Sequence, residues 1–241
     1  MRIVAIDSSS MVASIAVAED DVILAEYTIN HKKTHSQTLL PMLDEIKKMI
    51  ELDMDSIDAI AITGGPGSFT GLRIGSATAK GIGLALDIPI VNVPTMDAMA
   101  YNLYGIQGII CPIMDARRTQ VFTGLYRFEG GEMVTVKEQQ PMDLLELIAE
   151  INEIGEKVTF TGDAIVSYGN IIRDNIKVDF DFPPAHLSRQ RAAALAALAI
   201  DYLNNDRQDR IESSNEHSPE YLRLSQAERE RNEAKRRNKA E

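Results

Sequence analysis

Acidic and hydroxyl side chains follow an apolar segment near the N-terminus. Residues 3–6 predict a short buried strand, and Asp7, Ser8 and Ser9 come directly after it. A carboxylate in such a turn can hold a metal-bound nucleotide, and hydroxyl and amide groups beside it can bind phosphate. An Asp-Ser pair after a strand is equally typical of a structural turn. Two interpretations of these residues therefore stay open, a vestigial site for ATP or ADP and a simple turn.

A second acidic turn follows a later apolar strand. Residues 109–114 predict that strand, and Asp115, Arg117 and Arg118 come after it. These side chains could border a cleft that Asp7 also borders, or they could form a tight turn with exposed arginines. In the first case the chain would be an ATP-dependent kinase or hydrolase that uses Asp7 and Asp115. We keep this enzyme as the alternative hypothesis.

The histidines and the cysteine do not form a convincing catalytic or metal site. His31 and His35 are four residues apart, which would place both on one face of a helix, as a metal pair requires. They precede Pro41 in a polar segment, however, and no third ligand is apparent. Cys111 lies in an apolar run without a neighbouring base, which predicts a buried free thiol. We therefore predict neither catalytic residues nor a metal site.

A glycine-rich loop joins a predicted strand at 58–62 to a predicted helix at 69–86. The loop lacks the lysine of a phosphate-binding Walker loop, and its glycines are spaced one residue too widely for a dinucleotide-binding fingerprint. An anion could still bind the backbone amides at the start of the helix. The alternative is a tight turn that Ser68 or Thr70 caps.

Small residues recur every four positions in the helix after this loop. Gly71, Gly75, Ala79 and Gly83 share one face of it. Each glycine within a helix costs roughly 0.5–1 kcal/mol relative to alanine, so another backbone must approach this face closely. We interpret the face as a docking surface.

Composition restricts the classes of function. The chain has 241 residues, 44% of them hydrophobic, and a formal net charge of −11. Such a charge argues against a large nucleic-acid surface. A single cysteine and the lack of a long apolar segment predict a soluble, cytoplasmic protein without membrane contact. From residue 226 to 241, glutamates alternate with basic residues, which predicts a solvated tail.

The order of predicted elements occurs twice along the chain. A strand meander at 3–6, 12–18 and 22–29 is followed by a helix at 38–51, and a second meander at 109–114, 121–128 and 133–136 is followed by a helix at 144–154. Pro41 falls in the first turn of the helix at 38–51 or kinks it. Each half thus reads as a βββαβα unit.

The repeat predicts an α/β fold of two lobes. The N-terminal lobe covers residues 1–104, the C-terminal lobe covers 105–225, and the charged tail covers 226–241. A cleft between lobes built from duplicated βββαβα units is the plan of the actin-like ATPase (ASKHA), or RNase H-like, fold. We expect the last helix, at 191–203, to pack across the second lobe.

The glycine-rich segment resembles a family signature. Residues 65–75, which read GPGSFTGLRIG, are similar to the signature of the bacterial TsaB (YeaZ) family. Segments 5–9, 35–41, 114–118 and 219–223 also follow the order found in that family. The resemblance extends over nearly the whole chain.

The resemblance implies a subunit of the machinery that places threonylcarbamoyl on the adenosine next to the anticodon in tRNAs that read codons beginning with A. It implies a non-catalytic scaffold that dimerises with the catalytic subunit TsaD and stabilises it. The ATPase TsaE would dock on that assembly, the chain would form a homodimer when alone, and tRNA contact would be indirect. Thr95 and Met99 match the positions of the metal-binding histidines of TsaD, so the resemblance implies no metal and no required cofactor. A glycoprotease role is the weakest hypothesis for the same reason.

The resemblance also implies that the first two helices of the N-terminal lobe contact TsaD, in agreement with the bare helix face. We expect the following residues at that interface, although some must also face the core: Leu39, Leu43, Ile46, Ile50, Phe69, Gly71, Leu72, Gly75, Ala79 and Gly83.

Overall fold

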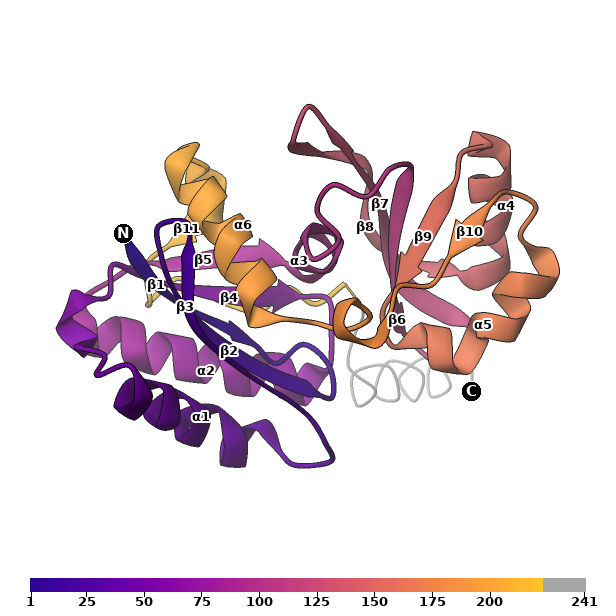
Figure 1. Ribbon diagram of the computed structural model, residues 1–241. Coiled ribbons are helices and arrows are strands. Elements are labelled where there is room, and N and C mark those ends of the chain that lie inside the picture. Colours follow the sequence, from indigo (N-terminus) through magenta and orange to yellow (C-terminus); the bar gives the residue numbers. More distant parts are fainter. Residues whose placement is uncertain (223–241) are drawn as a thin grey trace, which may run out of the picture.

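The computed structural model of the protein describes residues 1–222, which form two β-sheets with helices packed on them (Figure 1). The strands of the first sheet are β1 (Arg2–Asp7), β2 (Val12–Glu19), β3 (Val22–Asn30), β4 (Ala59–Gly65), β5 (Ile90–Pro94) and β11 (Ile211–Glu212). The strands of the second sheet are β6 (Ile109–Asp115), β7 (Gln120–Glu129), β8 (Glu132–Asp143), β9 (Val158–Thr161) and β10 (Phe180–Asp181). None of the helices in this part of the chain is long and apolar enough to cross a membrane.

The second sheet repeats the topology of the first, except that the first has β11 as an additional edge strand. The first has the strand order β11-β5-β4-β1-β2-β3 and the second has β10-β9-β6-β7-β8. In each, the meander strands pair antiparallel, whereas the first strand of the meander pairs parallel with the strand that follows the first helix. The predicted duplication and the actin-like fold are therefore confirmed.

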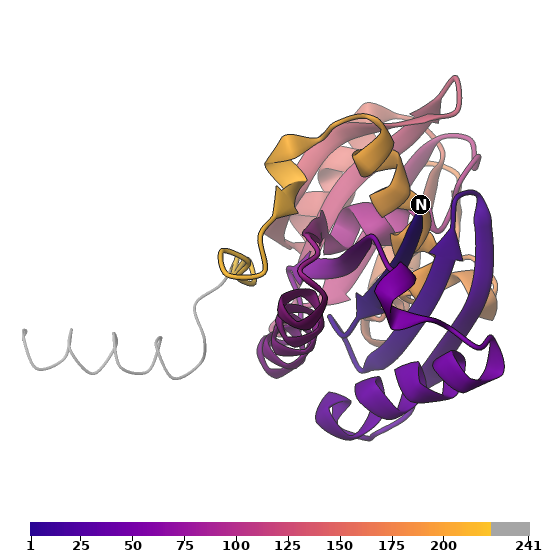
Figure 2. The ribbon, with the colours of Figure 1, turned by 90° about the vertical axis from the view of Figure 1, so that its left-hand side faces the viewer.

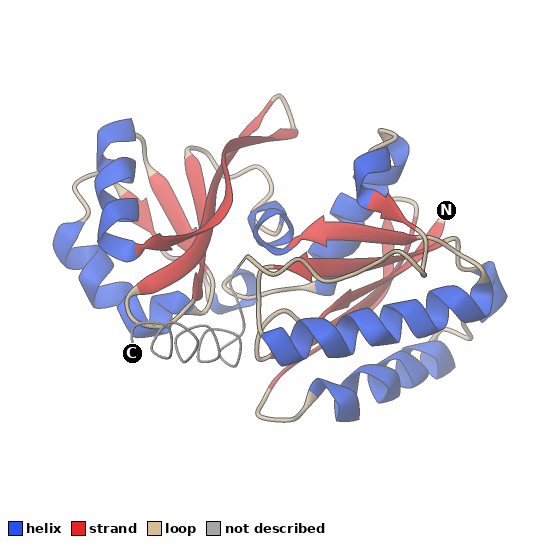
Figure 3. Cartoon of the chain, turned by 180° about the vertical axis from the view of Figure 1, so that it is seen from behind, coloured by secondary structure: helices blue, strands red, loops and turns tan. Residues whose placement is uncertain are grey.

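Helices cover both faces of the first sheet. α1 (His35–Met49) and α2 (Phe69–Leu86) lie side by side on one face, and α6 (Ala192–Asn204) covers the other (Figures 1 and 3). Successive strand residues point to opposite faces, so in β1 Val4 and Ile6 pack under α1 and α2, while Ile3 and Ala5 pack under α6. The apolar run of β1 is thus buried on both sides.

Two helices, α4 (Leu144–Ile154) and α5 (Ala164–Asn175), cover one face of the second sheet. A third helix, α3 (Thr95–Tyr101), lies between the two lobes. It contributes Met96 and Met99 to a separate apolar cluster, which also contains Met114, Phe122 and Tyr126 of the second sheet. The junction therefore has a core of its own.

The end of the described chain returns to the first lobe. The prediction that the last helix packs on the second lobe is wrong, because α6 packs on the first sheet and β11 pairs antiparallel with the edge strand β5. Consequently the second lobe does not extend over all of residues 105–225. The alanines of α6 face alanines of the sheet, and these small side chains allow close approach. The predicted tail at 226–241 lies outside the described residues.

The start of the first helix also differs from the prediction. α1 begins at His35 instead of near Thr38, so Pro41 lies inside the helix and is exposed to solvent. On that side, the carbonyl that would have accepted a hydrogen bond from residue 41 can bind water.

The small-residue face of α2 packs against this chain itself. A Cβ added to Gly71 would lie 2.1 Å from the backbone oxygen of Ser8, and one added to Gly75 or Gly83 would lie 2.2 Å from the hydroxyl oxygen of Ser8 or Ser214. The expected close approach is confirmed. The interpretation of this face as a partner surface is wrong, because spacing defines a helix face but not what covers it.

Most of the other residues expected at the partner interface are also internal. Only Ile50 and Phe69 among them remain partly exposed. Those buried in the N-terminal lobe are Leu39, Leu43, Ile46, Leu72 and Ala79.

We predict opposite effects of alanine at two glycines of α2. Gly71→Ala should lower the free energy of unfolding by roughly 1–3 kcal/mol, because its methyl group would overlap the Ser8 backbone. Gly81→Ala should raise it by about 0.5–1 kcal/mol, because Gly81 is exposed and an added Cβ meets no atom within 4 Å. Urea denaturation of wild type and both variants measures these changes in the free energy of unfolding. Equal effects at the two sites would contradict the packing described here.

Candidate functional site

A cleft of about 930 Å³ separates the two lobes. Its size is within the range of small-molecule sites. The first lobe contributes the turn after β1, the start of α1 and the loop that begins α2. The second lobe contributes the turn after β6 and Asp163, and the C-terminal segment contributes residues 220–222.

Only one of the three residues predicted to bind nucleotide lines this cleft. Ser9 does, whereas Asp7 and Ser8 lie behind the cleft wall. Asp7 is 1% exposed, and its Oδ1 accepts hydrogen bonds from the Ser9 backbone N–H at 2.9 Å and the Ser9 hydroxyl at 2.7 Å. The Ser8 hydroxyl donates to the Gly71 carbonyl at 2.9 Å. These contacts hold the turn against α2.

Burial also changes the ionisation of Asp7. It raises the pKa of Asp7 above its usual range, while the hydrogen bonds from Ser9 and the charge of His35 act in the opposite direction. Burial is the dominant cause. The side chain thus favours its neutral form more than an exposed aspartate does.

The second acidic turn borders the cleft from the other lobe. Asp115 accepts hydrogen bonds from the Arg117 backbone N–H at 2.7 Å and the Tyr168 hydroxyl at 3.0 Å. Residues 117–119 all have positive φ angles, which makes this a tight turn. Asp115 lines the cleft while Asp7 does not, so the structure does not bring the two carboxylates together on its surface.

Asp163 also lies in the cleft wall, although the sequence did not indicate it as a site residue. This carboxylate accepts the Asp115 backbone N–H at 3.1 Å, and burial raises its pKa. Its position directly after Gly162, at the end of the second βββαβ segment, was the available signal.

His35 and Cys111 are buried in the fold. His35 Nε2 lies 2.8 Å from the Ser10 carbonyl oxygen and links α1 to the turn after β1, whereas His31 is exposed. Burial raises the pKa of Cys111 to about 12, so the thiol is not a ready nucleophile. Within residues 1–222, no group of three or more His, Cys, Asp or Glu side chains could hold a metal ion.

The predicted cap at the start of α2 is confirmed, and Ser68 provides it, while anion binding at this loop stays a prediction. The Ser68 hydroxyl accepts a hydrogen bond from the Gly71 backbone N–H at 3.3 Å and caps α2. Beyond this cap, α2 exposes one continuous face formed by Thr70, Arg73, Ala77, Gly81, Leu84 and Ala85.

The outer face of α1 and α2 combines apolar and small side chains with charged ones, since α1 also exposes Asp44, Glu45, Lys47 and Lys48. Leu40 and Met49 of α1 are 58% and 79% exposed, and Leu84 of α2 is 55% exposed. On α2 they are accompanied by Ala77 and Gly81, and α2 contains no acidic residue. We call the exposed residues of these two helices the α1–α2 outer face. Large apolar side chains exposed among polar and charged ones also occur at protein contacts.

The C-terminal segment, residues 211–222, lies beside α2 in Figure 2 and runs along it in Figure 3. Lys80 Nζ donates to the carbonyls of Asn215 at 3.2 Å and His217 at 2.8 Å, and the Glu220 N–H donates to the Gly64 carbonyl at 2.7 Å. β11 anchors the start of this segment to β5. The segment therefore ends in a fixed position at the rim of the cleft.

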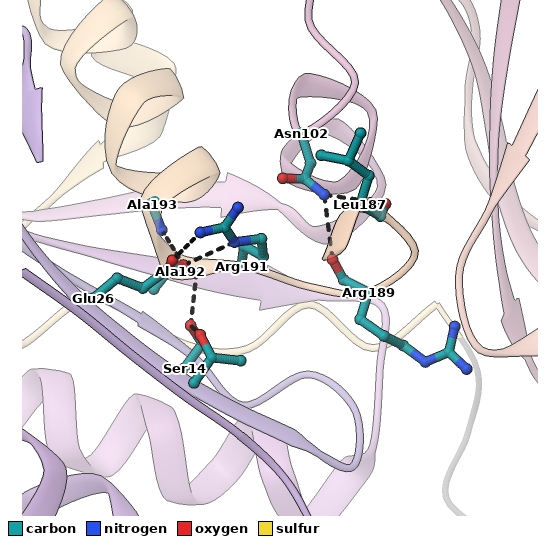
Figure 4. A network of polar contacts seen from close by, with 9 residues as sticks. Ser14, Glu26, Asn102, Leu187, Arg189, Arg191, Ala192 and Ala193 are labelled. Atoms are coloured by element: carbon teal, nitrogen blue, oxygen red, sulfur yellow. Dashed lines mark hydrogen bonds and ion pairs between the residues drawn. The ribbon is translucent and has the colours of Figure 1, made fainter. Parts of the chain in front are cut away.

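Polar contacts fix the junction between the lobes. The carboxylate of Asp97 on α3 accepts hydrogen bonds from Tyr126 of β7 at 2.7 Å and Tyr202 of α6 at 3.1 Å. Asn102 donates to the carbonyls of Leu187 and Arg189 in the connection that leads to α6 (Figure 4).

The start of α6 is bound to the first sheet (Figure 4). The Ala192 N–H donates to the Ser14 hydroxyl at 2.9 Å, and the Ala193 N–H donates to Glu26 at 3.1 Å. Arg191 forms an ion pair with the same Glu26. The first two N–H groups of the helix are therefore satisfied by side chains of β2 and β3.

A family model and individual proteins that are named for the same tRNA modification are similar to this chain. Residues 22–231 match the family model of TsaD, tRNA N6-adenosine threonylcarbamoyltransferase. The chain is 33% identical over 230 residues to the tRNA threonylcarbamoyladenosine biosynthesis protein TsaB of Bacillus subtilis, covering 95% of this chain and 96% of that protein. It is 34% identical over 134 residues to the Escherichia coli protein of the same name, covering 54% of this chain and 58% of that protein.

Solved structures share the fold. YeaZ from Pseudomonas aeruginosa superimposes with a TM-score of 0.74 at 24% identity, covering 92% of this chain and 99% of that one. The (R)-2-hydroxyglutaryl-CoA dehydratase component A of Acidaminococcus fermentans gives a TM-score of 0.50 at 13% identity, covering 85% and 99%. These identities are low, so the two structures show similarity of fold alone.

We predict that Asp7→Asn reduces the dependence of folding stability on pH. Because burial raises the pKa of folded Asp7 above the unfolded value of about 3.9, the folded state keeps this proton while the unfolded state loses it as pH rises. Ionisation of Asp7 thus lowers stability above about pH 4. Asparagine keeps an oxygen acceptor for Ser9 without the charge, so the variant should gain stability relative to wild type at neutral pH and lose that gain in acid.

Urea denaturation across a series of pH values measures the difference between the two proteins. A difference that stays constant with pH would show that Asp7 is not the group responsible.

Proposed function

The chain belongs to the TsaB (YeaZ) family and has a role in tRNA threonylcarbamoyladenosine biosynthesis, and we propose that it acts there as the non-catalytic subunit that binds and stabilises TsaD. The proposed binding surface is the α1–α2 outer face. This location replaces the buried faces of the same helices that the sequence suggested.

The exposed Gly81 of α2 is the main observation behind this proposal. Gly71, Gly75 and Gly83 have contacts inside the chain that require the absence of a side chain, but Gly81 has none. A glycine in an exposed helix interior lowers stability, and no atom of the described chain uses the space it leaves. The close approach of a partner helix would use that space. Gly81 lies on the exposed face, between Ala77 and Leu84.

The cleft favours this function over ATP-dependent catalysis. Asp7 is occupied by hydrogen bonds within its own turn, and Asp115 is held by its neighbours in a second turn. A kinase or hydrolase that uses both carboxylates would need them to face a common substrate. No observation favours that alternative, and binding of ATP or ADP beside Ser9 stays a prediction.

The other partners are parts of the same proposal. TsaE would dock on the assembly with TsaD, and a second copy of this chain could cover the α1–α2 outer face when TsaD is missing. The net charge of −11 supports an indirect role toward tRNA, because a phosphate backbone requires basic surface.

We predict that Gly81→Leu abolishes the complex with TsaD while the monomer stays folded. Leucine is a better helix former than glycine, and its side chain at this exposed position would hold a partner helix away. Size-exclusion chromatography with light scattering on mixtures with TsaD should show a 1:1 complex for wild type and separate proteins for the variant. Reconstituted tRNA modification should fall in parallel.

Ala149→Leu is the matched control, because Ala149 is an exposed small residue on α4 of the other lobe. It should leave the complex intact. A complete complex with Gly81→Leu would show that α2 is not the binding surface, and a wild-type protein that does not bind TsaD would contradict the proposed function itself.

A further inference from the structure

Arg73 is held rigidly on the exposed side of α2. Its guanidinium carbon lies 3.9 Å from the ring centroid of Phe69, one turn earlier in the same helix. Its Nε donates to the hydroxyl of Tyr221 at 3.1 Å, and the rings of Phe69 and Tyr221 stack with centroids 4.7 Å apart. Two aromatic rings from distant parts of the sequence therefore fix one exposed cation.

The terminal nitrogens of this guanidinium have no partner within residues 1–222. Arg2, Arg127 and Arg191 form ion pairs with glutamates. No carboxylate of the described chain pairs with Arg73, and the same holds for Arg117, Arg118, Arg173 and Arg189. The chain has 36 acidic and 25 basic residues, so acidic groups are abundant elsewhere. Of the six exposed residues of α2, Arg73 alone is charged.

We propose that Arg73 is a preformed receptor for an aspartate or glutamate side chain of the protein that binds the α1–α2 outer face. This inference rests on the proposed function. Arg73, Ala77 and Gly81 follow one another at intervals of four, so the cation lies on the same helix face as the proposed contact. The two unpaired terminal nitrogens present the planar fork that binds a carboxylate with two hydrogen bonds.

Fixing the side chain in advance strengthens such a contact. An arginine side chain that is mobile before binding loses rotamer entropy when a partner immobilises it. This loss costs about 0.5–1.5 kcal/mol of binding free energy per side chain. Stacking on Phe69 and the hydrogen bond to Tyr221 have already restricted Arg73. Arginine and aromatic residues in such arrangements are typical of the few residues that dominate binding energy.

The C-terminal segment thereby becomes part of the partner surface. Tyr221 is 41% exposed, and it reaches Arg73 because Lys80 and Gly64 fix the segment along α2. The partner would therefore contact a composite of α2 and residue 221. Neither Arg73 nor Tyr221 is among the interface residues that the sequence predicted.

We predict that Arg73→Gln weakens the affinity for TsaD at least about tenfold, as measured by titration calorimetry. Arg73→Lys should restore only part of the affinity, because an ammonium lacks the planar fork. Tyr221→Phe keeps the ring and removes the hydroxyl, so it should cause a smaller loss. The wild-type affinity should also fall more steeply with added salt than that of Arg73→Gln.

Arg173→Gln is the matched control, because Arg173 also stacks on a phenylalanine, Phe182, at 4.9 Å, but on α5 of the other lobe. It should bind TsaD as wild type does. Thermal unfolding of each variant shows whether it is folded, and Arg73 is exposed enough that little change is expected.

The outcomes separate the two proposals. If wild type binds TsaD and Arg73→Gln binds equally well, the receptor inference is wrong while the proposed function stands. If wild type does not bind, the proposed function fails and this inference fails with it. If Arg73→Gln keeps its affinity for TsaD but lowers binding of purified tRNA, the guanidinium recognises phosphate and the inference is overturned.

Discussion

The contact between α2 and the turn after β1 is the constraint on which the rest of the structure depends. At Gly71 the helix lies so near the Ser8 backbone that no side chain fits between them. The Ser8 hydroxyl then donates to the Gly71 carbonyl, and Ser68 caps the helix start. This contact fixes the direction of α2 over the sheet. It therefore also fixes one wall of the cleft, the orientation of the outer helix face and the position of Arg73.

Small side chains also allow the last part of the described chain to pack closely on the first lobe. Alanines of α6 pack on Ala5 and Ala61 of the first sheet, and Gly83 allows Ser214 to approach α2. Because these contacts return residues 192–222 to the first lobe, the C-terminal segment can add Tyr221 beside Phe69. The buried carboxylate of Asp97 receives hydroxyl groups from both lobes, and this polar junction sets their relative position.

In this actin-like fold, the two carboxylates predicted to act on ATP are bonded to their own neighbours. Asp7 is closed behind Ser9, and Asp115 is enclosed by its own turn and Tyr168. Two features without a partner in residues 1–222 lie outside the cleft, on α2. Gly81 leaves space that no atom of the described chain uses, and no carboxylate of residues 1–222 pairs with the terminal nitrogens of Arg73. The location of these unsatisfied features, rather than the fold, is what points to protein binding.

The sequence by itself determined the order of elements, the duplication and the family. Alternation in the two meanders predicts strands because side chains in a strand alternate between faces, and the four-residue spacing from Gly71 to Gly83 predicts a bare helix face for the same geometric reason. Only the tertiary structure decided what that face meets. Periodicity reports which residues share a side, but whether Ser8 or a partner lies opposite depends on contacts between distant segments. The return of α6 to the first sheet and the meeting of Tyr221 with Arg73 were hidden for the same reason, since residues 148 positions apart have no local pattern in common.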